Sequence, residues 1–181
     1  MTVAINGTPA ALWFVSPAQI NFEMPPEVPP GKTTVVVTSG GASSAPFAIT
    51  VPQAGPGIFV YNGSRAVAVN NPGNTLADVS HPAPPGSVIT VYLTGIGPVD
   101  NPVAANTPSP SSPPARANLP YSATIDGKDA DVQYLGLTPG GIALAQANII
   151  VPSLSPDDYS VVIRVGGTPS NAAIISVGAS R

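Results

Sequence analysis

The fold is decided by a stretch that occurs twice, as Ala18-Gln19-Ile20-Asn21-Phe22-Glu23-Met24-Pro25 and as Ala145-Gln146-Ala147-Asn148-Ile149-Ile150-Val151-Pro152. Three flanking segments recur in the same order: residues 5–7 and 125–127, residues 12–14 and 132–134, and residues 35–41 and 161–167. Because four separate segments keep their order, we interpret residues 5–51 and 125–177 as two copies of one structural unit.

Each copy has the sequence signals of strands joined by tight turns. Asn6-Gly7 and Asp126-Gly127 lie between apolar segments, and such pairs supply the positive φ of a two-residue hairpin. Gly40-Gly41 and Gly166-Gly167 follow β-branched runs in the same way. Each copy is therefore predicted to be a hairpin, a middle strand that ends in Pro, and a second hairpin.

Further strands are predicted between the copies, at residues 58–61, 65–70 and 87–94. Within the last of these, Ile89, Val91 and Leu93 alternate with Thr90, Tyr92 and Thr94, the pattern of a half-buried strand. Residues 98–120 contain seven prolines and are predicted to be a long surface loop.

Composition supports an all-β fold. The 181 residues include 24 Pro and 18 Gly, which disfavours long helices, and 43% are hydrophobic, too many for a disordered linker. We predict two tandem immunoglobulin-like β-sandwich domains, residues 1–53 and 54–181. The second copy follows about 65 residues of extra strand-rich sequence, and the first follows four residues. We therefore expect the first sandwich to lack its N-terminal strands and to expose an edge that would allow a homodimer.

Charge and cysteine content exclude several classes of function. Six Lys and Arg against nine Asp and Glu give a net charge of −3 with no basic block, which excludes nucleic acid as a partner. The chain has no Cys, which excludes disulfides, thiolate catalysis and Cys-based zinc sites. We expect no membrane span and no signal peptide in this chain.

A family resemblance extends over nearly the whole chain. The string Val15-Ser16-Pro17-Ala18-Gln19-Ile20-Asn21-Phe22 is its most specific part, and residues 5–12, 43–47, 54–59, 66–70, 86–98 and 146–148 add to it. These residues resemble a Solibacter-type domain family at the C-termini of large acidobacterial proteins. The resemblance implies tandem immunoglobulin-like or TIG-like sandwiches in exported, surface-associated proteins, with no established activity. Glu23 departs from the family, in which Gln is usual.

Asp78, Ser80 and His81 are the first candidates for chemistry, as the parts of a hydrolase triad. Triad members usually come from separate loops, and these three share one Pro-flanked loop. We therefore interpret them as turn residues whose side chains bond to nearby backbone amides, and we keep the hydrolase as the weaker alternative.

Carboxylates offer a second enzymatic route, because a glycosidase needs two of them. Glu23 is the candidate that we name. Asp129 and Asp131 lie two residues apart and would share a strand face, which would suit calcium, but the ligand spacing of known calcium loops is absent. We interpret the Asp residues of this hairpin as parts of a turn and a solvated strand face, and we predict no cofactor.

Amides and aromatic rings are the candidates for ligand binding. Gln19 and Asn21 recur as Gln146 and Asn148, which favours a structural role over reading sugar hydroxyls. Sugars stack on exposed rings, and Trp13, Tyr61 and Tyr92 are the rings available. Because Phe14 aligns with Tyr134, we expect Phe14 in the core and Trp13 on the outer face.

The sequence therefore predicts a non-catalytic structural, adhesive or spacer module of an exported bacterial surface protein, secreted or at the cell surface as part of a longer chain. Its partners would be a polysaccharide or another surface protein. The alternative is a carbohydrate-active module that binds sugar or uses carboxylates such as Glu23. An enzyme is not favoured, and any enzymatic activity would be that of a glycosidase or an esterase.

Overall fold

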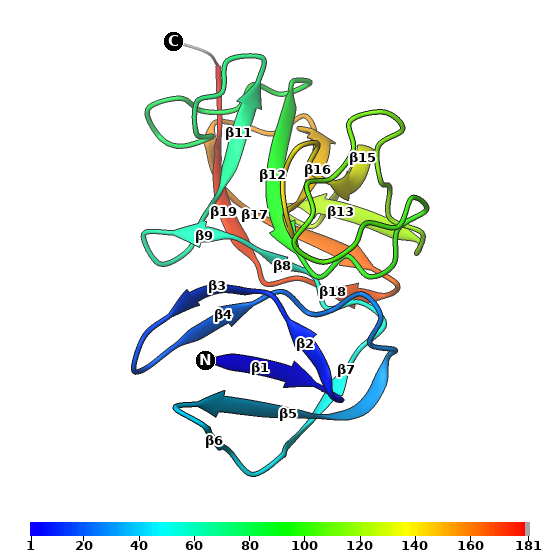
Figure 1. Ribbon diagram of the computed structural model, residues 1–181. Helices are drawn as coiled ribbons and strands as arrows, with labels where there is room; N and C mark the ends of the chain where they lie inside the picture. The colour runs from blue at the N-terminus through cyan, green and yellow to red at the C-terminus, as the bar shows by residue number, and fades with distance from the viewer. Residues whose placement is uncertain (180–181) are drawn as a thin grey trace.

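The computed structural model describes residues 1–179, and these residues form strands, turns and loops with no helix (Figure 1). The fold class is all-β, as predicted. The first unit contains β1 (Thr2–Ile5), β2 (Thr8–Ala10), β3 (Leu12–Val15), β4 (Ile20–Phe22), β5 (Gly31–Ser39), β6 (Ala42–Ser43) and β7 (Phe47–Val51). The second unit contains β8 (Gly57–Ile58), β9 (Val60–Tyr61), β10 (Arg65–Ala66), β11 (Ala68–Asn71), β12 (Val88–Thr94), β13 (Tyr121–Ile125), β14 (Lys128–Ala130), β15 (Val132–Leu137), β16 (Ala145–Ile150), β17 (Asp157–Val165), β18 (Thr168–Pro169) and β19 (Ala173–Val177).

The strands of the second unit make two sheets that face each other in an immunoglobulin-like sandwich. One sheet has the order β11-β12-β16-β15, with β8 also on β12. The other has the order β14-β13-β17-β19-β10-β9, with β18 on β17. Their inner side chains form one buried cluster, in which Ile89, Val91 and Leu93 of β12 are fully buried, as the alternation predicted.

The first unit has the corresponding strands in smaller sheets. One sheet has the order β2-β1-β5-β6, with β7 also on β5, and the other is the pair β3-β4. Only Val3, Ile5 and Val28 are buried in its hydrophobic cluster. Figure 1 shows this unit beneath the second, with β3 and β4 nearest to it.

Strand register shows that the two units are copies of one design. Val3 pairs with Val37 and Ile5 with Val35 in the first unit, and in the second Ala123 pairs with Ile163 and Ile125 with Val161. Both copies interrupt the pairing of the next hairpin at the same place, between Leu12 and Phe14 and between Val132 and Tyr134. The alignment drawn from the sequence is therefore confirmed strand by strand.

The predicted hairpin turns have the backbone conformation that their residues favour. Asn6 and Gly7 have φ of 50° and 80°, and Asp126 and Gly127 have φ of 55° and 71°. Two successive positive φ values match the twist of the flanking strands, which explains why Asn-Gly and Asp-Gly occur here.

One expectation about burial was wrong, and another holds in part. Phe14 is 49% exposed, although its counterpart Tyr134 is only 9% exposed. The difference arises because Arg116, from the long loop of residues 98–120, lies over the Tyr134 ring, and the first unit has no such loop. The loop itself is not wholly on the surface, since Ser109 and Ala115 are buried.

Candidate functional site

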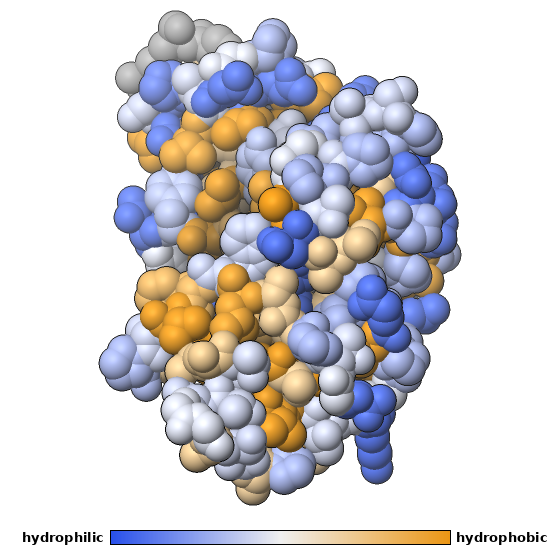
Figure 2. Space-filling model, viewed as in Figure 1, coloured by the Kyte–Doolittle hydropathy of each residue, from blue (hydrophilic) through white to orange (hydrophobic). Residues whose placement is uncertain are grey.

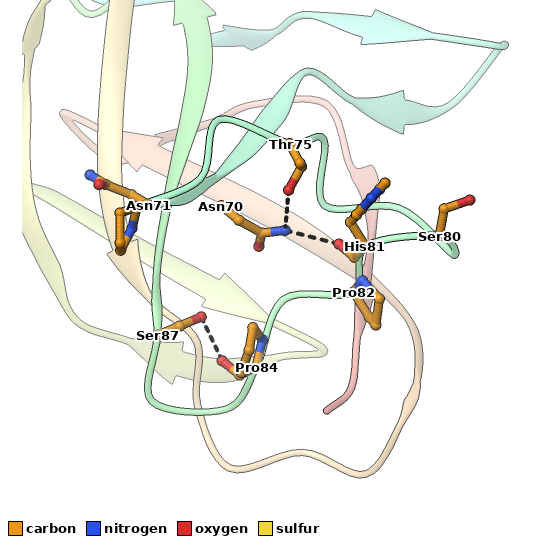
Figure 3. A pocket seen from close by; sticks show the side chains of 9 residues that line it. Asn70, Asn71, Thr75, Ser80, His81, Pro82, Pro84 and Ser87 are labelled. Carbon is orange, nitrogen blue, oxygen red and sulfur yellow. Dashed lines mark hydrogen bonds between the residues drawn. The ribbon is translucent and has the colours of Figure 1, made fainter. Parts of the chain in front are cut away.

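The loop that carries Asp78, Ser80 and His81 is held together by its own side chains. The carboxylate Oδ1 of Asp78 accepts hydrogen bonds from the backbone N–H of Ser80 at 2.8 Å and of His81 at 3.0 Å. The His81 Nδ1 is 3.8 Å from that oxygen. No hydrogen bond joins the Ser80 hydroxyl to the imidazole within residues 1–179, and Figure 3 shows the hydroxyl directed away from the ring. The carboxylate therefore caps a turn.

This loop borders a pocket of about 290 Å³ beside β11 (Figure 3). The amide nitrogen of Asn70 donates to the carbonyl of His81 at 2.9 Å and to the Thr75 hydroxyl at 3.3 Å. The Ser87 hydroxyl donates to the carbonyl of Pro84 at 2.7 Å. These bonds tie the loop to the strand, and the side-chain oxygen of Asn70 is buried without a hydrogen-bond partner among the described residues.

Glu23 lies just after β4 and contacts the other unit. Its Oε2 accepts a hydrogen bond of 2.8 Å from the backbone N–H of Asn106, which belongs to the long loop of the second unit. A carboxylate of one unit that accepts a backbone N–H of the other helps to hold the two units together. The comparison of the two sequence copies did not indicate this bond, because Asn106 lies 83 residues from Glu23 and outside both copies.

The repeated amides form the same side-chain bond in both units. Gln19 Nε2 donates to Asn21 Oδ1 at 2.7 Å, and Gln146 Nε2 donates to Asn148 Oδ1 at 3.1 Å. In the second unit, the Thr90 hydroxyl of β12 adds a bond of 3.1 Å to the same oxygen of Asn148. The amide pair therefore marks where a neighbouring strand docks on β16.

The candidate aromatic residues lie on three different sheets. Trp13 is on β3, Tyr61 on β9 and Tyr92 on β12. Trp13 is 50% exposed, as expected, and Phe14 beside it is exposed as well. Figure 2 shows hydrophobic side chains gathered over β3 and over the β1–β5 region of the first unit. Both units expose large apolar side chains, and those of the first unit include Trp13, Phe14 and Phe47.

Asp129 and Asp131 both lie on the surface of the β14 hairpin. Among the residues that the structure describes, no group of three or more His, Cys, Asp or Glu side chains is placed to hold a metal ion.

A polar network that the sequence did not indicate joins three strands of the second unit. Arg65 Nη1 donates to Asp158 Oδ1 at 3.0 Å and to the Ser176 hydroxyl at 2.9 Å, and that hydroxyl donates to Asp158 Oδ1 at 2.6 Å. Hydrogen bonds from Arg65 and then Ser176 hold the pKa of Asp158 below its ordinary value, and the bond to Asp158 raises the pKa of Arg65. The network fastens β10 to β17 and β19.

Tyr134 anchors the long loop. Its hydroxyl donates to the carbonyl of Leu137 at 2.7 Å and lies 3.3 Å from the carbonyl of Ala115, while the Arg116 guanidinium lies 4.9 Å from the ring centre. Burial raises the pKa of Tyr134, although the charge of Arg116 opposes the shift. The ring and hydroxyl together fix residues 115–116 against β15.

The chain between the two units is packed against the second unit. Ala54 and Ile96 are buried in its core, and the N–H of Gly55 donates to the carbonyl of Gly95 at 2.9 Å. Gly95 has φ of +72°, and a Cβ there would lie 1.9 Å from the carbonyl oxygen of Gly55. Only glycine allows this approach.

Comparison with known proteins finds a match for the first unit. Residues 1–51 match the model of the IPT/TIG domain, a non-catalytic immunoglobulin-like module that is common in surface and adhesion proteins. A search of curated proteins found no relative of this chain. Over residues 1–179, the structure contains no helix of the length and apolarity needed to cross a membrane.

Proposed function

We propose that this chain is a non-catalytic structural module that serves as a spacer or adhesive element of an exported bacterial surface protein. The observation that carries the proposal is the junction between the units. Residues 52–57 are packed beneath Gly95 and Gly97, where a Cβ would lie 1.9 Å and 2.6 Å from the carbonyl oxygens of Gly55 and Gln53. A junction packed in this way holds two domains at a set spacing, which a free linker cannot do.

The second contact between the units supports the same role. Glu23 of the first unit accepts a hydrogen bond from the backbone N–H of Asn106 in the long loop of the second unit. The two units are therefore joined at this loop as well as through residues 52–57. The Asp78 side chain, the other candidate for acid–base work, is occupied by two backbone amides of its own turn. The carboxylates of Glu23 and Asp78, the candidates for acid–base catalysis, thus accept backbone hydrogen bonds that stabilise the fold.

Placement at a bacterial surface rests on family likeness. The TIG match of residues 1–51, the resemblance to acidobacterial C-terminal domains and the absence of cysteine from the sequence favour it. The partner in an adhesive role would be a polysaccharide or another surface protein.

Stiffness provides the direct test. Because the sequence contains no Cys, Ser43→Cys and Ser153→Cys give one spin label in each unit without background. Pulsed electron–electron double resonance should give a single narrow distribution of the distance between the two labels, and Gly95→Ala should broaden that distribution. A broad distribution in the parent chain would contradict the spacer role.

An activity screen tests the non-catalytic part. Chromogenic glycosides and esters should show no turnover above a buffer control. Turnover that is abolished by Glu23→Gln or by His81→Ala would overturn the proposal and identify a hydrolase.

Sugar binding is a second candidate, favoured by the neighbouring exposed rings of Trp13 and Phe14. Flat exposed rings can stack on sugar faces, much as they stack on other planar or apolar ligands. Polysaccharide binding that is lost in Trp13→Ala and kept in Tyr61→Ala would support it, and equal retention by both variants would exclude Trp13 as the platform.

A further inference from the structure

One continuous segment of the second unit completes both of its sheets. Within residues 57–94, β12 pairs antiparallel with β16, and β10 pairs in parallel with β19. This segment covers the core, so Ala147 and Ile149 of β16 and Ile175 of β19 are fully buried.

The corresponding edges of the first unit are unpaired. By register, β4 is the counterpart of β16 and β7 the counterpart of β19. Across residues 1–179, β4 pairs only with β3, and β7 pairs only with β5. We call these two edges, with the inner side chains beside them, the open face.

Burial follows the pairing. Ile20 and Phe22 on β4 are half-buried, whereas their counterparts Ala147 and Ile149 are fully buried. Phe47 on β7 is 71% exposed, whereas its counterpart Ala173 is fully buried. Exposed apolar side chains along an unpaired strand edge are the usual mark of a strand-docking surface.

The side-chain amides indicate what the docking strand carries. Asn148 pairs in register with Thr90, and its Oδ1 accepts the Thr90 hydroxyl. Asn21 is the counterpart of Asn148 and holds the same bond to its Gln, but no hydroxyl bonds to it within the described part of the chain. A strand in the equivalent place would set a Thr or Ser opposite Asn21 and aliphatic residues opposite Phe22 and Ile20, as Ile89-Thr90-Val91 does in the second unit.

We propose that the open face is an acceptor for an extended segment of another immunoglobulin-like repeat, which pairs antiparallel with β4 through an aliphatic–Thr/Ser–aliphatic triplet and continues onto β7. The binding mode is β-strand addition, in which backbone bonds give affinity and alternate side chains give specificity. A second copy of this chain would have to release its residues 57–94 to donate them, because they already complete its own second unit, so the proposal assigns the segment to a different repeat. The inference is independent of the spacer role.

The test uses a synthetic peptide with the sequence of residues 57–94, made soluble by terminal lysines. Isothermal titration should show a one-to-one complex with the full chain, and hydrogen exchange should slow at residues 20–22 and 47–51. Thr90→Val in the peptide and Asn21→Ala in the protein should each weaken binding about fivefold to tenfold, the loss of one hydrogen bond. Asn118→Ala, on the exposed long loop, is the matched control and should leave binding unchanged.

Three results would overturn the proposal. The first is the absence of binding at high micromolar peptide. The second is binding that neither Thr90→Val nor Asn21→Ala weakens, which would exclude the proposed register. The third is a stable dimer of the chain in sedimentation, with β4 protected from exchange before peptide is added, which would make a second copy the occupant.

Discussion

Replacing Gly95 by Ala tests the junction between the units. Gly95 has φ of +72°, so an alanine there pays about 1 kcal/mol in backbone strain. Its Cβ would meet the carbonyl oxygen of Gly55 at 1.9 Å and the carbonyl carbon at 2.6 Å. Backbone atoms cannot yield as a flexible side chain does, so residues 54–56 must move away.

The cost of that movement can be assembled from the bonds it breaks. The hydrogen bond from Gly55 N–H to Gly95 carbonyl contributes about 1 kcal/mol. Partial exposure of Ala54 and Ile96, which are buried at the junction, adds roughly 1–2 kcal/mol. We therefore expect Gly95→Ala to lower the free energy of unfolding of the second unit by about 3–4 kcal/mol.

Gly86 is a control that separates the backbone strain of a positive φ from the steric clash of an added Cβ. Gly86 has φ of +81°, but a Cβ there would have no heavy atom within 4 Å. Gly86→Ala should therefore cost only about 1 kcal/mol, the strain alone. Urea unfolding followed by circular dichroism measures both variants under one set of conditions. Equal destabilisation by the two variants would refute the close packing of the junction.

Two further predictions concern Tyr134, with its counterpart Phe14, and Asp158. Tyr134→Phe should lower the free energy of unfolding of the second unit by about 1–2 kcal/mol, because it removes the hydrogen bond of a buried hydroxyl. Phe14→Leu, at the exposed counterpart, should change the stability of the first unit by less than about 0.5 kcal/mol. Thermal unfolding measures both variants, and equal effects would contradict the difference in burial. Asp158→Asn should cost about 1 kcal/mol at pH 7, less than a buried charge-assisted bond, because the Asp158 side chain is 42% exposed and solvent screens its charge. The pKa of Asp158 is lowered in the folded state, so its contribution is present above its ordinary pKa and disappears as pH falls through the folded value. Denaturant titrations from pH 7 to pH 2 should therefore bring the variant and the parent together at the acid end, and a constant gap would argue against the charged pair with Arg65.

Local patterns made much of the fold predictable. Asn6-Gly7 and Asp126-Gly127 required positive φ at two positions, and the hairpins followed. The recurrence of Gln19 and Asn21 as Gln146 and Asn148 indicated a structural amide pair, and each pair forms one side-chain bond. Both inferences depended on residues close together in sequence.

Features that depend on distant residues were not predictable. The burial of Tyr134 and the exposure of Phe14 differ because a loop covers one ring and not the other, although the two residues align. Arg65 and Asp158 lie 93 residues apart and carry no local signal of their pairing. The close approach of Gly95 to Gly55 has no local sequence signal either, because Gly95 is one of 18 glycines in the chain.

Native-state hydrogen exchange compares the two copies of the unit directly. The amides of Ala147 and Ile149, on β16 between two strands, should exchange on the order of a hundredfold more slowly than those of Ile20 and Phe22 on β4, which pairs on one side within residues 1–179. That difference is the expected signature of one design completed in the second unit and open in the first. Equal protection of β4 and β16 would mean that the first unit is already closed, and would contradict the open face.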